Sequence, residues 1–130
     1  MEIKSFNTNT DYNDVSSWWK AQDWPILPES ILSDCGFIIK DNNLKIAATW
    51  VFKTNSPIYI MEWTVGNPEV SWEKRQEGIQ LLTEAASSWS KEHGASYLLT
   101  MTKSKRFIEK LKDSGFKETD DEMVHLMRSL

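Results

Sequence analysis

The feature that most constrains the fold is a strand, a long helix and a second strand in direct succession. Ile58–Val65 is an apolar, strand-like run that a Gly-Asn-Pro sequence ends, because glycine and proline interrupt regular structure. The helix that follows ends at Gly94, a typical C-terminal stop, and its apolar face holds Ile79, Leu82, Ala86 and Trp89. The apolar segment 95–102 then forms the second strand. Such a unit predicts two parallel strands joined by a right-handed crossover.

The remaining elements surround this unit. Met1–Phe6 alternates as a strand does, and Phe37–Ile39 with Leu44–Phe52 has the pattern of a hairpin. Thr10 or Asp11 is a suitable N-cap for a helix, whose apolar stripe would be Tyr12, Val15, Trp18 and Trp19. A short helix is expected at 28–34, with Pro28 near its first turn. Residues 103–115 form an amphipathic helix that ends at Gly115, and 116–130 a final strand.

The element order is therefore β-α-α-β-β-β-α-β-α-β. It predicts an α+β (mixed α/β) fold with a central mixed, mostly antiparallel sheet flanked by helices. We find no repeat, no linker and no low-complexity segment, so residues 1–130 are expected to form a single domain. Because the expected final strand would lie exposed, it can pair with another copy, and a homodimer is possible.

The composition is that of an ordinary globular protein and excludes several classes of function. The 130 residues are 40% hydrophobic and 26% charged, and the net charge of −4 argues against nucleic-acid binding. No run of about 18 apolar residues could span a membrane, and the first ten residues do not resemble a signal peptide. A lone cysteine, Cys35, is typical of the reducing cytoplasm. Two histidines and one cysteine far apart in sequence predict no metal site.

Seven tryptophans are unusual for this length. They can fill the core of a small domain or stack against a ligand. Trp18, Trp19 and Trp24 lie close in sequence to Asp23 and Glu29. This segment is either a packing surface or an aromatic, acidic pocket that attracts a cationic amine.

The stretch Arg75–Leu82 places a glycine, Gly78, where the long helix is already under way. If Ser71 caps the helix, Gly78 lies two turns in and serves close packing against the sheet. If the helix begins nearer Gln76, the glycine allows an anion to approach free amide groups at a helix N-terminus. The sequence leaves both alternatives open.

These elements and motifs together resemble the GCN5-related N-acetyltransferase (GNAT) superfamily over nearly the whole chain. The family's strand before the main helix ends in a V-x-P-like turn, and Val65 and Pro68 are similar but one residue further apart. The acyl-CoA signature [Q/R]-x-x-G-x-[G/A] is matched at Arg75 and Gly78, whereas Gln80 stands where a small residue is usual. The Gly115-Phe116 pair after the last helix also resembles the family.

The resemblance implies how acetyl-CoA would bind as a co-substrate. The main chain at Thr64 and Val65 would hold the pantetheine arm. The pyrophosphate would lie on the segment Arg75, Gln76, Glu77, Gly78, Ile79 and Gln80. Ser104 occupies the place of an asparagine that the family often has early in the last helix.

Glu62 is the only ionisable residue in its apolar strand and is the candidate general base for an amine. Alternatively, it faces solvent and balances a lysine on a neighbouring strand. The tyrosine that the family uses as general acid falls on Leu111, which cannot donate a proton. His93 at a helix end and His125 in the last segment are expected to be structural.

Two functions follow from the resemblance. The first is an acyl-CoA-dependent N-acetyltransferase that moves an acetyl group from acetyl-CoA to a small-molecule or peptide amine by direct transfer. The second is a catalytically degenerate protein of the same fold that serves as a binding or structural module. Leu111 and Gln80 favour the second function.

Overall fold

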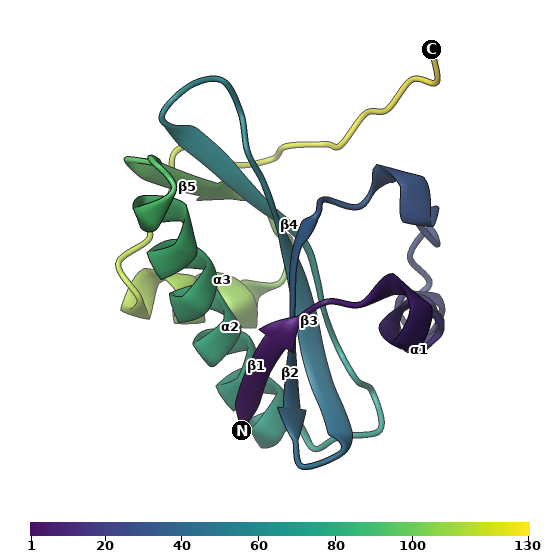
Figure 1. The fold of residues 1–130 in the computed structure, drawn as a ribbon. Helices are drawn as coiled ribbons and strands as arrows, with labels where there is room; N and C mark the ends of the chain where they lie inside the picture. Colours follow the sequence, from purple (N-terminus) through teal and green to yellow (C-terminus); the bar gives the residue numbers. More distant parts are fainter.

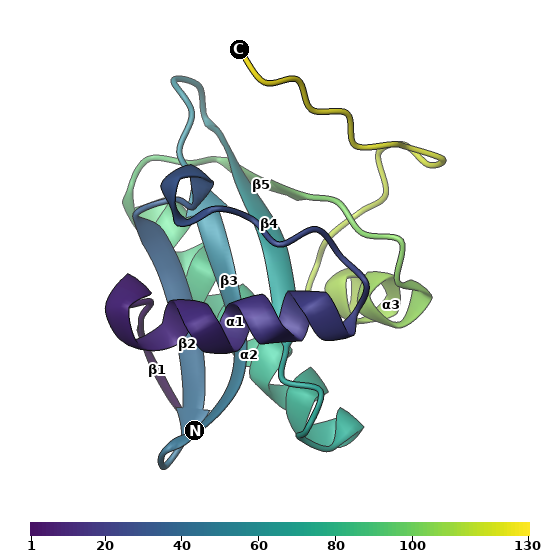
Figure 2. The same ribbon diagram turned by 90° about the vertical axis from the view of Figure 1, so that its right-hand side faces the viewer.

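The computed structural model describes all 130 residues, which build a five-stranded sheet between two layers of helix (Figures 1 and 2). The helix α1 covers one face, and α2 with α3 covers the other. The strands follow the order β1-β2-β3-β4-β5; neighbours are antiparallel, except that β5 runs parallel to β4 across the α2 crossover. The elements are β1 Glu2–Ser5, α1 Thr8–Ala21, the 3-10 turn η1 Glu29–Ile31, β2 Cys35–Asp41, β3 Leu44–Phe52, β4 Ile58–Gly66, α2 Trp72–Glu92, β5 Tyr97–Thr100 and α3 Lys105–Asp113.

The predicted α+β architecture, with a mixed and mostly antiparallel sheet, is confirmed. Ser71 caps α2 as predicted, because its Oγ accepts a hydrogen bond from the Lys74 amide at 3.3 Å. The cap of α1 is Asn7 rather than Thr10 or Asp11. The Asn7 Oδ1 accepts from the Asn9 amide at 3.0 Å, while Asp11 accepts from the Asn7 amide at 2.9 Å. Asp11 therefore supports the helix start from inside the helix.

Each face of the sheet has its own apolar core. On the α1 face, Val15, Trp18 and Trp19 pack against a strand surface made of Ile38, Ala48, Trp50 and Val65. On the opposite face, α2 and α3 pack on residues that include Ile39, Ile46, Ala47, Val51 and Met61. The buried tryptophans Trp18, Trp19 and Trp50 thus fill the core, whereas Trp24 is exposed.

Two predicted elements are wrong. The expected short helix at 28–34 is only the 3-10 turn η1, for which Pro28 is the capping residue rather than part of the first turn. The expected strand at 116–130 is absent, and these residues contain no helix or strand. Its acidic start, "ETDDE", favours solvent, and its alternating apolar residues find no partner on the free edge of β5.

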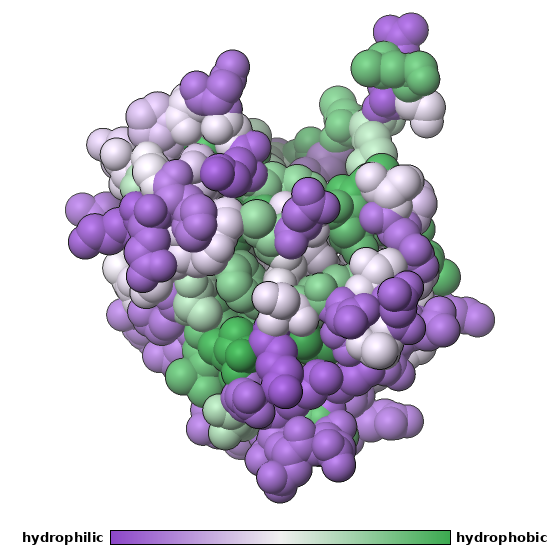
Figure 3. Space-filling model, viewed as in Figure 1, coloured by the Kyte–Doolittle hydropathy of each residue, from purple (hydrophilic) through white to green (hydrophobic).

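The C-terminal segment, residues 117–130, leaves α3 and projects beyond the sheet with apolar atoms exposed (Figure 3). Its large exposed apolar side chains are Met123, Val124, Leu126, Met127 and Leu130. Among the helices of the molecule, none combines the length and apolar character that a membrane crossing needs.

Candidate functional site

The sheet opens where β4 and β5 part. The two strands pair from Ile58 opposite Tyr97 to Met61 opposite Thr100, and the pairing stops there. At the same level β4 carries a bulge against β3, since Trp50 faces Glu62 and Ala48 faces Val65. The bulge includes Trp63, whose φ of +63° lies in the left-handed region. The bulge lies just past the last residues that pair with β5, and we call the place where the two strands stop pairing the fork.

Glu62 lies at the base of the fork. It is 8% exposed, and its Oε1 accepts a hydrogen bond from the Met101 amide at 3.1 Å. The carboxylate thus takes a main-chain donor at the point where β4 and β5 no longer pair. Burial raises the pKa of Glu62 above its ordinary value, although the Met101 amide and His125 act in the opposite direction. Because Glu62 stands opposite Trp50, its side chain is on the α1 face of the sheet.

His125 of the C-terminal segment reaches the same place. Its Nε2 lies 3.6 Å from Oε2 of Glu62, and its ring lies 5.9 Å from the Trp63 ring between centroids. The sequence predicted a structural role for His125, since a strand pattern does not tell where an unpaired segment will run. His93, by contrast, is the C-cap of α2, and its ring stacks on Trp89 at 4.0 Å between centroids.

Thr64 and Val65 follow the bulge, beyond the last residue that pairs with β5. The Thr64 hydroxyl makes a 2.7 Å hydrogen bond with that of Thr49, and Val65 is buried in the α1-side core. Their side chains are therefore engaged in the fold, while the main chain borders the fork. A strand border of this kind offers main-chain hydrogen-bonding groups to an extended chain.

Gly78 lies in the second turn of α2 and is packed against the sheet. A Cβ on Gly78 would lie 2.8 Å from Cγ2 of Ile46 and 3.2 Å from Cγ2 of Ile39. Since α2 begins at Trp72, the amides of Gln76–Gln80 lie inside the helix, past its free first turn. The glycine thus serves close packing, and this segment does not fit a phosphate group.

Arg75 is also committed to the fold. Its Nη1 donates hydrogen bonds to the carbonyls of Asn67, Pro68 and Val70, at 3.3, 3.2 and 3.0 Å. Its side-chain stem covers Gly66, where an added Cβ would lie 2.9 Å from Cδ of Arg75. The guanidinium group therefore holds together the turn that leads from β4 into α2.

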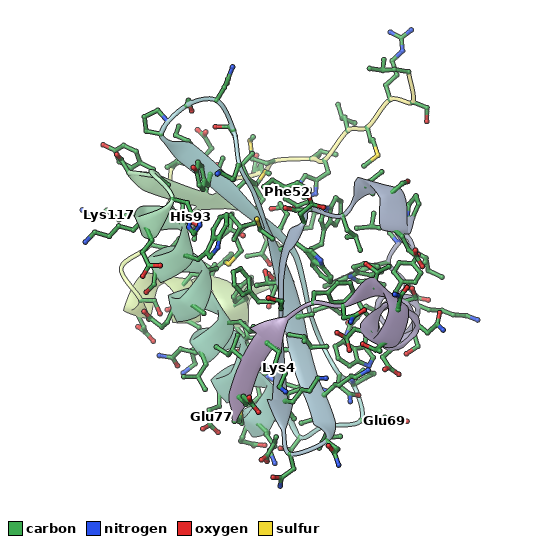
Figure 4. All side chains as sticks on the ribbon, in the orientation of Figure 1. Lys4, Phe52, Glu69, Glu77, His93 and Lys117 are labelled. Atoms are coloured by element: carbon green, nitrogen blue, oxygen red, sulfur yellow. The ribbon has the colours of Figure 1, made fainter.

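The other predicted donor-binding residues are not gathered into one site. Ile79 is partly buried in the core, and Gln76 Oε1 is buried without a hydrogen-bond partner. Glu77 and Gln80 are exposed, and Figure 4 shows Glu77 near the N-terminal end of α2 and His93 near the opposite end. Ser104 caps α3, since its Oγ accepts from the Phe107 amide at 3.2 Å.

No tyrosine lies where the family resemblance expects an acid. Leu111 is buried in the core under α3, so an apolar contact occupies that position. The Tyr59 hydroxyl donates to the carbonyl of His93 at 2.5 Å, and Tyr97 is exposed at the start of β5. The structure contains no group of three or more His, Cys, Asp or Glu side chains arranged to hold a metal ion.

A depression of about 480 Å³ lies between the first turns of α2 and α3. Its residues are Trp72, Glu73, Arg106, Glu109 and Lys110. The Arg106 guanidinium carbon is 4.8 Å from the Trp72 ring centroid, a cation–π contact. The sequence gives no signal for this surface, because its residues come from two helices whose relative placement no local pattern reveals.

Neither the known protein families nor the curated proteins give a match to the sequence. Solved structures do match. The aminoglycoside N-acetyltransferase AAC(6')-Iy in complex with CoA is 21% identical, with a TM-score of 0.62 over 98% of this chain and 100% of that chain. Wild-type TTHA1254 from Thermus thermophilus is 15% identical, with a TM-score of 0.66 over 100% and 98% of the two chains.

A third similar structure is Rv2747 from Mycobacterium tuberculosis, in complex with CoA and NLQ. It is 9% identical, with a TM-score of 0.71 over 96% of this chain and 76% of that chain. Identities this low establish a shared fold and leave the activity to be argued from the site. With β4 and β5 parted around Glu62 and α2 crossing between them, the chain has the GCN5-related N-acetyltransferase fold.

Proposed function

We propose that this chain is an N-acetyltransferase that uses acetyl-CoA and transfers the acetyl group directly to an amine. The observation that carries the proposal is the buried Glu62 carboxylate at the base of the fork. Structures of the same fold are solved with CoA, and an ionisable group at the opening of a sheet is a candidate for chemistry.

Glu62 is suited to act as the general base. An ammonium group must lose a proton before its nitrogen can attack an acyl carbon. Burial raises the pKa of Glu62, which makes its carboxylate a stronger base than an exposed one. Glu62 would accept the proton of the incoming amine, and the nitrogen would then bond to the acyl carbon of the thioester. The carbon–sulfur bond would break, and CoA would leave as a thiolate that takes a proton from water. Since Glu62 is on the α1 face, the amine would enter from the side of α1.

The donor would be held in two parts. The main chain of Thr64 and Val65 would hold the pantetheine arm beside the fork. The phosphates would lie near the first turn of α2, where Arg106 and Lys110 border the depression with Trp72. This placement replaces the segment Arg75–Gln80, whose amides and guanidinium group are engaged within the fold.

A thermal shift experiment tests donor binding. A ligand that binds only the folded protein must raise its melting temperature, so we expect acetyl-CoA at about millimolar concentration to do so. Arg106→Ala with Lys110→Ala should weaken the effect, while Lys91→Ala at the far end of α2 should not. A melting temperature that acetyl-CoA does not change would contradict the proposal.

Turnover tests the base. Glu62→Gln should lower kcat/KM for a panel of amines by roughly 10²-fold or more at neutral pH, the usual range for loss of a general base. Glu84→Gln, on the exposed surface of α2, is the matched control and should retain activity. Equal rates for the Glu62 variant and the wild-type protein would remove Glu62 from the reaction.

A second candidate function is a non-catalytic module. The commitment of Arg75 to three carbonyls and the buried Leu111 favour it, because both occupy motif positions with purely structural contacts. In that case acetyl-CoA should neither bind nor react. A search by mass spectrometry for CoA that co-purifies with the protein separates the two functions.

A further inference from the structure

His125 makes the ion pair and the ring contact that join the C-terminal segment to the fork. Its imidazole lies against two consecutive residues of β4, with Nε2 3.6 Å from the Glu62 carboxylate and the ring tilted by 39° on the Trp63 ring. The segment's other ion pair joins Glu118 to Lys112 on α3, near the start of the segment and away from the fork. No other side chain between residues 119 and 130 makes an ion pair or a ring contact with the rest of the molecule.

The path of the segment explains how this contact arises. It leaves α3 on the α2 side of the sheet, and its end lies on the α1 side (Figures 1 and 2). The segment thus passes the opening of the sheet, where Glu62 lies. Its exposed apolar residues flank His125 on both sides, as Met123, Val124, Leu126 and Met127.

Glu62 has no other ionisable partner. The strand β3 places the uncharged Trp50 opposite it, and the chain after β5 provides the Met101 amide. From α1, the Trp19 indole approaches the Trp63 carbonyl at 3.5 Å and brings no charge. The other charged residues of the C-terminal segment are exposed and make no ion pair with Glu62; they are Lys117, Glu118, Asp120, Asp121, Glu122 and Arg128. The single cationic group that can compensate the buried carboxylate is therefore the imidazole of His125.

We infer that His125 is a positioning residue for Glu62, and that the C-terminal segment is part of the active site through it. This inference rests on the proposed function, in which Glu62 is the base. An imidazole can present an N–H to a carboxylate in either protonation state. His125 thereby favours the ionised carboxylate and keeps it turned toward the fork, where an amine would lose its proton.

The first test measures Glu62 directly and needs no turnover. In protein labelled with 13C-glutamate, the Glu62 carboxyl signal is identified by its loss in Glu62→Gln and followed against pH by NMR. His125→Gln removes the imidazole that favours the ionised carboxylate, so it should raise the pKa of Glu62, by about half a pH unit. His93→Gln, at the end of α2, should leave it unchanged, and His125→Lys should restore the wild-type value. An unchanged titration in His125→Gln would overturn the inference.

The second test measures acetyl transfer against pH. In His125→Gln the acid limb of kcat/KM should move to higher pH by the same amount, with an unchanged KM for acetyl-CoA and restoration in His125→Lys. An acid limb that does not move would show that His125 has no positioning role. The two failures are distinct. If the wild-type protein transfers no acetyl group but the NMR shift is present, the proposed function fails and the control of Glu62 by His125 stands.

Discussion

At the scale of single residues, Gly78 is a helix position with no room for a side chain. An added methyl group would meet the β-branched methyl carbons of Ile46 and Ile39, which cannot swing away as the end of a long side chain can. Alanine stabilises a helix interior by about 1 kcal/mol relative to glycine, but overpacking a well-filled core costs about 1–3 kcal/mol. We therefore expect Gly78→Ala to lower the free energy of unfolding, measured with urea.

The exposed neighbour Gln80 provides the control for Gly78. Gln80→Gly introduces the intrinsic helix cost of glycine without a change in packing, and should lose about 0.5–1 kcal/mol. If Gly78→Ala were instead stabilising by a similar amount, the inference that α2 packs closely on the sheet at Gly78 would be contradicted.

Glu62 makes stability depend on pH in a predictable direction. Its pKa is higher in the folded protein than in the unfolded chain, so the folded protein binds this proton more tightly. The resulting stabilisation is complete below the unfolded pKa and is lost as the pH rises through the folded pKa. Glu62→Gln does not titrate, so its melting temperature should exceed that of the wild-type protein at neutral pH, and the difference should shrink toward about pH 4.

The matched variant Glu84→Gln should show no such pH-dependent difference, since Glu84 is exposed on α2. A melting-temperature difference for Glu62→Gln that stays constant from neutral to acid pH would mean that burial of the ionised Glu62 carboxylate does not lower the stability of the folded protein. A higher stability together with lost turnover would be the expected signature of a residue kept for chemistry.

At the scale of elements, the buried Asp11 carboxylate forms ion pairs that link α1 to the sheet. Lys45 Nζ lies 3.0 Å from Asp11 Oδ1, and Lys40 Nζ lies 3.9 Å from the same atom. Burial alone would raise the pKa of Asp11, yet the Asn7 amide and Lys45 hold it below the ordinary value. Asp11→Asn should therefore lower the free energy of unfolding by about 1.5–3 kcal/mol, the usual range for hydrogen bonds to a charged group, since the buried carboxylate accepts from the Asn7 amide and pairs with Lys45.

Asp14 is the control for Asp11 on the same helix. It also binds Lys45, at 2.6 Å, but its side chain is 54% exposed. Asp14→Asn should change the free energy of unfolding by about 0.5 kcal/mol or less, the usual range of an exposed ion pair. Equal losses for the two variants in urea unfolding would mean that burial does not distinguish the two carboxylates.

The C-terminal segment is the second element with a testable property. Its main chain belongs to no helix or strand, so the amides of residues 117–130 should exchange with solvent far faster than those of β3. Hydrogen exchange followed by NMR measures this directly. Protection of alternate amides in 123–129, comparable to that of β5, would instead support the final strand that the sequence pattern predicts.

The elements that the sequence predicted well have their signals in local chemistry. Ser71 marks the start of α2 and Gly94 its end. A hydroxyl cap and a glycine in the left-handed region, with φ of +102°, both act within one helical turn. The final strand failed because alternation shows only that a segment can pair. Whether it does depends on a free edge elsewhere in the molecule, and no residue in the segment carries that information.

At the scale of the whole molecule, one sheet serves two cores. The strand β3 contributes Ala48 and Trp50 to the α1 face, and Ala47 and Val51 to the face under α2 and α3. Neither core can be lost without the other, so unfolding should be cooperative. Tryptophan fluorescence, to which the buried Trp18, Trp19 and Trp50 of the α1 face contribute, should give the same urea midpoint as helix content from far-UV circular dichroism. Two separate midpoints would show that the layers unfold independently.

The candidate site was predictable in part. Glu62 could be found from sequence, because a carboxylate within an apolar strand is conspicuous. The roles of Arg75 and Gly78 could not, since the same residues serve a phosphate site or a packed helix according to where α2 begins. That depends on a cap several residues earlier, together with the sheet beneath. His125 escaped prediction because its partner lies 63 positions away along the chain, as the contact with Glu62 shows.

The bulge at Trp63 has a consequence for anyone who edits or aligns this sequence. It shifts the alternation of β4 by one residue, so that Glu62 and Val65 face the same side although three positions apart. A one-residue deletion there would move the side chains of one half of the strand to the opposite face of the sheet. Either the carboxylate would exchange faces with Met61, or Val65 would leave the α1-side core for the opposite face of the sheet. The length of this strand is thus as much a part of the site as the identity of its residues.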